Sequence, residues 1–80
     1  MFDQIRQYTV HGKTYEQEHG NAFDRGSADS YYHRDRRPHK GGSGGKYGFE
    51  PITNLTDAEL EAYHAGYDYN EQFGHKKDWD

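Results

Sequence analysis

Cysteine is absent from this 80-residue sequence, and aliphatic residues are scarce. The lack of cysteine excludes disulfides, CxxC redox chemistry and cysteine-based zinc sites. Leu, Ile, Val and Phe together number only nine, too few for a thick hydrophobic core in a chain that is already short. Any folded structure must therefore depend on other apolar side chains.

A long apolar run is also missing. No stretch approaches the roughly 20 residues that a membrane span requires. The first residues lack the basic and apolar regions of a secretory signal peptide. These absences predict a cytoplasmic protein with no membrane partner.

Motifs of known chemistry are incomplete. Gly12-Lys13-Thr14 has the end of a P-loop but not its first glycine, and His33-Arg34-Asp35 copies a kinase fragment in a chain far too short for a kinase. The six histidines show no i, i+4 pair. No nucleophile, base and orienting group can be assembled from the sequence. We expect no enzyme activity, no cofactor and no metal site.

Aromatic residues are plentiful: the chain has eight Tyr, four Phe and one Trp. Tyrosine can be buried where its hydroxyl finds a hydrogen-bond partner. We therefore expect a single small domain over residues 1–80 with a core rich in tyrosine.

The clearest secondary-structure signal lies at Leu55-Thr56-Asp57-Ala58-Glu59-Leu60. Thr56 and Glu59 form a capping box there, with leucines at the hydrophobic-staple positions. Apolar residues then recur with helical spacing, and Gly74 follows as a natural stop. The pattern predicts a helix over about 57–73.

A second capping box at Thr14-Tyr15-Glu16-Gln17 predicts another helix over about 15–33. Gly20 and Gly26 would each cost such a helix about 1 kcal/mol relative to alanine. A shorter helix beginning at Asn21 is the alternative.

The remaining segments complete the predicted fold. Ile5 to Val10 is β-prone and His11-Gly12 can turn, so the N-terminus is a candidate strand or hairpin. The run Gly41-Gly42-Ser43-Gly44-Gly45 is typical of a flexible linker, which predicts a flexible loop over about 38–50. The fold class that follows is small and mostly α, with two antiparallel helices joined by a glycine-rich basic loop.

Charge is distributed unevenly around the net value of −4. Residues 31–47 carry five basic side chains against one acidic one. Lysine and arginine beside tyrosine are the residue types that bind phosphates and stack on bases. The candidate nucleic-acid-binding residues are Arg34, Arg36, Arg37, Lys40, Lys46 and Tyr47, with Tyr31 and Tyr32 as further stacking candidates. A solvated basic turn that balances acidic helices is the competing interpretation.

An offset of 40 residues aligns Ala22-Phe23-x-x-Gly26 with Ala62-Tyr63-x-x-Gly66, and Arg36-Arg37 with Lys76-Lys77. The small residues of this pattern would let two helix backbones approach closely. The aromatic-x-x-Gly helix followed by basic residues resembles the repeat of ribosome modulation factor, over roughly residues 15–37 and 58–79. That resemblance implies ribosome binding.

The strings Gly26-Ser27-Ala28-Asp29-Ser30-Tyr31-Tyr32 and Ala62-Tyr63-His64-Ala65-Gly66-Tyr67 resemble small uncharacterised accessory proteins of phages and prophages. This resemblance implies an accessory role. We expect a non-enzymatic, phage-type modulator that binds a host protein through a tyrosine-rich helical surface. The candidate partner-binding residues are Tyr63, Tyr67, Tyr69, Asn70 and Phe73. Asn70 has a second interpretation, a hydrogen bond to the opposing helix. The alternative function is an RNA- or ribosome-binding factor that uses the basic loop, residues 34–46.

Overall fold

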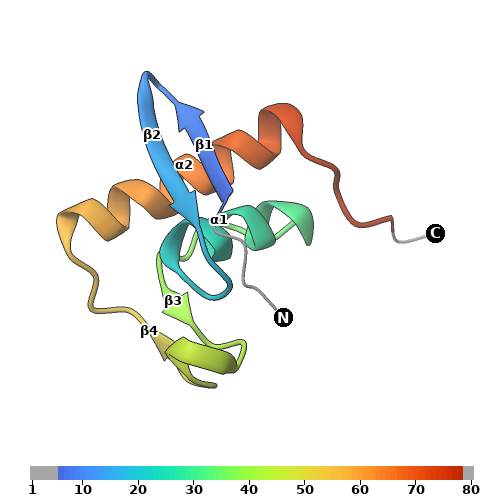
Figure 1. Cartoon of the computed structure of the whole chain (residues 1–80). Coiled ribbons are helices and arrows are strands. Elements are labelled where there is room, and N and C mark those ends of the chain that lie inside the picture. The colour runs from blue at the N-terminus through green and yellow to red at the C-terminus, as the bar shows by residue number, and fades with distance from the viewer. Residues whose placement is uncertain (1–5, 79–80) are drawn as a thin grey trace.

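The computed structural model describes residues 6–78, which form two helices and two short antiparallel strand pairs (Figure 1). The elements follow in the order β1 (Arg6–Val10), β2 (Lys13–Gln17), α1 (Ala22–Tyr31), β3 (Lys40–Gly41), a 3-10 turn (Gly45–Tyr47), β4 (Pro51–Ile52) and α2 (Asp57–Phe73). This is a small α+β fold. The expectation of a mostly α protein built as an antiparallel two-helix hairpin is therefore wrong.

Residues 6–17 form the N-terminal hairpin, in which Tyr8 lies opposite Tyr15. The two connecting residues, His11 and Gly12, have positive φ angles of 54° and 75°. Such a backbone matches the right-handed twist of the flanking strands in two-residue hairpins. The predicted hairpin is thus present; Ile5, at the start of the predicted strand, lies outside the described residues.

The capping box at Thr14 does not start a helix. Thr14 and Glu16 are exposed while Tyr15 between them is half-buried, the two-residue alternation of a strand with one face on the core. A four-residue capping motif is a weak local signal, and pairing along all five residues of β1 outweighs it. The helix predicted over 15–33 is therefore wrong in its first third.

The shorter alternative is correct. Asn21 caps α1, because its side-chain oxygen accepts the Asp24 amide at 2.9 Å. Gly20, just before the cap, has a φ of +86°, which would interrupt a helix that ran through it.

The prediction for α2 is confirmed at both ends. The Thr56 hydroxyl accepts the Glu59 amide at 3.1 Å, and the Glu59 carboxylate accepts the Thr56 amide at 3.0 Å. The helix then runs to Phe73 and ends at Gly74.

The two helices cross at their glycines. A Cβ built on Gly26 would lie 2.0 Å from the carbonyl oxygen of Tyr63, and one built on Gly66 would lie 2.0 Å from that of Phe23. No heavier residue fits either position without separating the helices. The predicted close approach of the helix backbones is confirmed.

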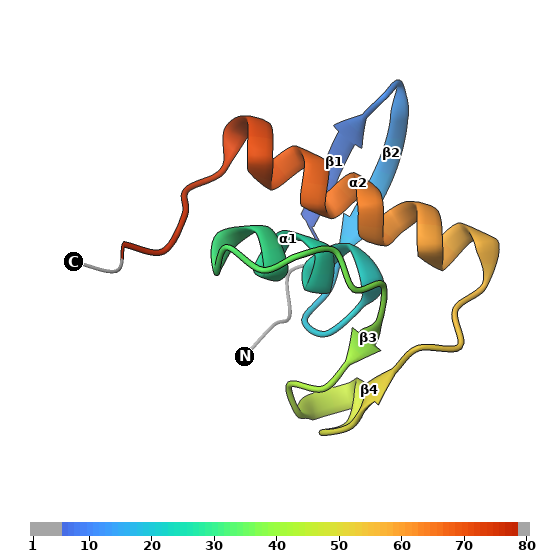
Figure 2. The same ribbon diagram turned by 180° about the vertical axis from the view of Figure 1, so that it is seen from behind.

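The direction of the helices is the second correction to the predicted fold. Both run from the same side of the molecule to the other (Figures 1 and 2), and near their C-terminal ends Asn70 Nδ2 donates to Ser30 Oγ at 3.0 Å. A helical hairpin needs only a short connection. Here residues 32–56 carry the chain back across the molecule before α2 begins.

The core lies where the N-terminal hairpin covers the helix pair. Phe23 is almost fully buried, and the ring of Tyr8 stacks on it with 5.4 Å between centroids. Tyr15 stacks on the same ring at 5.8 Å, and Tyr69 meets Tyr8 edge-on at 4.7 Å. Four aromatic rings thus take the place of missing aliphatic side chains, as the composition predicts.

The glycine-rich segment has secondary structure. Lys40 pairs with Ile52 and Gly41 with Pro51, so that β3 and β4 form a second small hairpin below the helices (Figure 1). The Gly41 amide also donates to the Gly20 carbonyl at 2.7 Å, which ties this hairpin to the start of α1. Positive φ angles at its glycines, such as +80° at Gly44, give the turn a path that other residues rarely follow.

Candidate functional site

A buried polar pair organises the chain beyond α1. Tyr63 is fully buried, and its hydroxyl donates to the carboxylate of Asp29, which is also buried. The same hydroxyl accepts the Arg37 amide at 2.9 Å. Burial first, and then the hydrogen bond to Asp29, raise the pKa of Tyr63 above its ordinary value of 10. The phenol therefore stays protonated and holds residue 37 against α2.

The predicted partner-binding residues are divided between core and surface. Tyr63 and Asn70 are buried. Asn70 donates to Ser30 of α1, which agrees with its second interpretation, a hydrogen bond to the opposing helix. Tyr67 and Tyr69 are half-buried, with the Tyr67 hydroxyl donating to the Arg34 carbonyl. Phe73 differs from the other four because it is 64% exposed.

The cations of the basic loop, residues 34–46, mostly face the protein's own acids. Four of the five pair with carboxylates: Arg34 with Asp29 at 3.3 Å, Arg36 with Asp68, Lys40 with Glu59, and Lys46 with Glu18 at 3.4 Å. The charge of the loop is therefore largely neutralised where it lies against the helices and against Glu18, the residue after β2. This arrangement matches the interpretation of a basic turn that balances acidic elements.

Two of these pairs, Arg36 with Asp68 and Lys40 with Glu59, bind the loop to α2. Arg36 donates to Asp68, stacks over the Tyr67 ring at 4.3 Å and lies 3.0 Å from His64 Nδ1. Burial alone would raise the pKa of Asp68, but the hydrogen bonds from Arg36 and His11 outweigh it and lower the pKa. Such partners hold the Arg36 guanidinium away from an external phosphate.

The tyrosines of this region are engaged as well. Tyr47 donates to Glu18 at 3.0 Å, and Lys46 lies 5.6 Å from its ring centroid. Tyr31 meets Tyr32 edge-on at 4.9 Å, and the Arg34 guanidinium covers the Tyr32 ring at 4.8 Å. Ring faces that a base would need are thus partly covered from within the chain.

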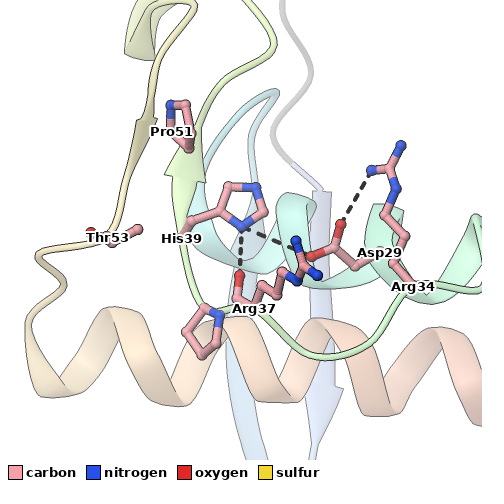
Figure 3. A pocket seen from close by; sticks show the side chains of 7 residues that line it. Asp29, Arg34, Arg37, His39, Pro51 and Thr53 are labelled. Atoms are coloured by element: carbon pink, nitrogen blue, oxygen red, sulfur yellow. Dashed lines mark hydrogen bonds and ion pairs between the residues drawn. The ribbon is translucent and has the colours of Figure 1, made fainter.

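Arg37 is the exception among the loop cations. Its guanidinium has no carboxylate within ion-pair distance among residues 6–78. It lines a hollow of about 470 Å³ between the loop, the end of α1 and β4 (Figure 3). The remaining lining residues are Asp29, Arg34, Pro38, His39, Pro51 and Thr53.

An exposed apolar surface lies on the β3–β4 hairpin. Phe49 is 85% exposed, although a Cβ built on Gly44 would lie only 2.8 Å from its ring. Pro51 and Ile52 follow it and are also exposed. This surface is not among the sites predicted from the sequence. The one feature that could have indicated it is an aromatic residue, Phe49, beside a glycine-rich segment with no apolar periodicity around it.

Over residues 6–78, no group of three or more His, Asp or Glu side chains could hold a metal ion. Within the same range, no helix is both long and apolar enough to cross a bilayer. Comparisons with protein-family models, curated proteins and solved structures find no match to this chain.

Proposed function

We propose that this protein is a non-enzymatic binding protein that contacts another protein through the exposed apolar surface of the β3–β4 hairpin. The observation that carries the proposal is the exposure of Phe49, a residue that is 85% exposed although its ring lies close to Gly44. Aromatic rings held in this way are common at the centres of protein interfaces, where burial supplies much of the binding energy.

The neighbours of Phe49 extend the same surface. Pro51 and Ile52 are exposed and occupy β4, so their backbone is fixed by pairing with β3. A surface held before binding loses less conformational freedom when a partner arrives. We propose a host protein as this partner, a choice supported by the resemblance to phage accessory proteins.

RNA or ribosome binding through the basic loop has weaker support. Four of its five cations already pair with carboxylates, so a phosphate would have to displace an acidic group at each of them. Surface ion pairs of this kind are individually weak, but exchanging a carboxylate partner for a phosphate adds little binding free energy. A partner that covers Phe49 would displace no ion pair of residues 6–78, because this apolar side chain is exposed.

The test is capture of partners from host lysate by the tagged wild type, Phe49→Ala and Phe73→Ala, each with and without nuclease. A captured protein that survives nuclease, is lost with Phe49→Ala and is kept with Phe73→Ala supports the proposal. Phe73→Ala is the control, because it removes a second exposed phenylalanine ring, but from the predicted helical surface instead of the hairpin.

Two results would overturn the proposal. Capture that depends on nucleic acid would favour the RNA alternative. Capture lost with Phe73→Ala but kept with Phe49→Ala would transfer the binding site to α2. Circular dichroism spectra of both variants show whether the fold is intact.

A further inference from the structure

The hollow beside the β3–β4 hairpin has the features of a ligand site. We propose that it binds a carboxylate carried on an apolar group, with the Arg37 guanidinium as the direct partner of the carboxylate. The proposal goes beyond the protein contact through Phe49, because it depends on a hollow and a cation instead of exposed apolar side chains.

The charge of the hollow favours an anion. Asp29, its one carboxylate, already accepts the Tyr63 hydroxyl on one oxygen and Arg34 at 3.3 Å on the other. Arg37 adds a second cation that no carboxylate neutralises among the described residues. The lining groups therefore carry an excess of positive charge at neutral pH even with His39 uncharged.

Arg37 is held in place through its backbone. Its amide donates to the Tyr63 hydroxyl at 2.9 Å, and its carbonyl accepts His39 Nδ1 at 2.6 Å. The close-up shows Arg34, Arg37 and His39 close to Asp29 (Figure 3). Because the main chain of Arg37 is held by hydrogen bonds at both its amide and its carbonyl, its backbone loses little conformational freedom when a ligand binds the guanidinium.

The lining and the volume of the hollow favour an apolar group next to the carboxylate of the ligand. Pro38 and Pro51 supply apolar surface, and the volume of about 470 Å³ suits one side chain or a small molecule. A guanidinium binds a carboxylate through two parallel hydrogen bonds, which makes a single free arginine a good match for a monoanion. A phosphate dianion would bring more charge than Arg37 can neutralise, close to the buried Asp29.

The test is a titration of the full chain with benzoate, followed through backbone amide signals in 15N NMR spectra. We expect saturable shifts at Arg37, His39 and Thr53. Benzamide, which has the same ring without the charge, should bind at least about tenfold more weakly, the difference expected for a charge-assisted pair.

Two variants test the assigned cation. Arg37→Gln should weaken benzoate binding by about tenfold or more while its amide keeps the bond to Tyr63. Lys46→Gln removes the same charge from outside the hollow and should leave binding unchanged. Equal binding of benzoate and benzamide, or an unchanged affinity in Arg37→Gln, would overturn the proposal, as would no binding of any carboxylate probe.

A second arm identifies the source of the carboxylate. Acetyl-Ala-Ala-Phe is titrated with a free and with an amidated C-terminus. Binding of the free acid peptide in preference to benzoate assigns the site to the end of a polypeptide, and the reverse assigns it to a free organic acid; either supports the site. The Phe49→Ala variant should bind these probes like the wild type, so failure of the hairpin proposal would leave this result unaffected.

Discussion

Gly26 of α1 and Gly66 of α2 occupy equivalent positions at the helix crossing: a Cβ added at either glycine would lie 2.0 Å from a carbonyl oxygen of the other helix. They are 40 residues apart, as are Ser30 and Asn70, which are joined by a hydrogen bond at 3.0 Å one turn further along. Small residues at four-residue spacing let helix backbones approach this closely. The local repeat in the sequence therefore corresponds to a near-symmetric contact between two helices that run in the same direction.

Replacing Gly66 should test this contact. Gly66→Val places its side chain against the Phe23 carbonyl and should lower the free energy of unfolding by about 3 kcal/mol or more, a large share of the total for a domain this small. Urea denaturation followed by circular dichroism measures the loss. Ala58→Val, which adds similar bulk at an exposed position of α2, should cost well under 1 kcal/mol. A wild-type midpoint for Gly66→Val would mean that the helices do not cross here.

The buried Tyr63 hydroxyl should contribute to stability through both of its partners. Tyr63→Phe removes the donor to Asp29 and the acceptor of the Arg37 amide, so we expect a loss of about 2 to 4 kcal/mol. Tyr8→Phe is the matched control, because among residues 6–78 the Tyr8 hydroxyl has no hydrogen bond. Denaturation midpoints give the stability, and faster hydrogen exchange at Arg37 would show release of the loop. Equal stability of the two variants would contradict this role.

Local signals predicted the parts of the fold that depend on neighbouring residues. The reciprocal bonds of Thr56 and Glu59 make α2 readable from sequence, because both partners lie within one turn. The turn at His11 and Gly12 is similarly local. The four residues from Thr14 fit a helix start equally well, and only the pairing of Tyr15 with Tyr8 decides for a strand. Such a contact across the hairpin has no signature within the capping motif.

The candidate site depends on contacts that periodicity does not encode. Arg36 and Asp68 are 32 residues apart, and nothing near either residue shows that one neutralises the other. The burial of Tyr63 likewise follows from the direction of the helices, which places its hydroxyl over Asp29. The basic composition of the loop was therefore readable from the sequence, whereas the isolation of Arg37 was not.

Acid should destabilise the protein partly through Asp24. Its carboxylate accepts the Gly20 amide at 2.9 Å, Gln17 Nε2 at 2.8 Å and Arg25 Nη2 at 2.8 Å. Burial alone would raise the pKa of Asp24, but these bonds outweigh it and lower the pKa below 3.8. The stabilisation is complete well above that value and is lost as the pH falls through the lowered pKa of the folded state.

Stability measured by urea denaturation between pH 7 and pH 2.5 should therefore decline below about pH 4. Asp24→Asn should be less stable than the wild type at pH 7 and should show a smaller decline in acid. Asp35→Asn is the control, because Asp35 is exposed and makes no ion pair within residues 6–78. An Asp24→Asn profile parallel to that of the wild type would contradict the assigned contribution.

The salt dependence of RNA binding should show how many loop cations are free to contact phosphate. Each contact with a single strand contributes about 0.7 to the slope of log affinity against log salt, so five free cations would give about 3.5. Arg37 is the loop cation without a carboxylate partner in the described part of the chain, which limits the expected contribution of the loop to about 0.7. Titrations of a labelled single-stranded RNA at several salt concentrations measure the slope for the wild type, Arg37→Gln and Lys40→Gln. We expect weak binding whose slope falls with Arg37→Gln and is unchanged by Lys40→Gln, because Lys40 already pairs with Glu59. A slope near 3.5 that both substitutions reduce would show that the ion pairs open for RNA, and would then favour the basic loop over the Phe49 hairpin as the functional surface.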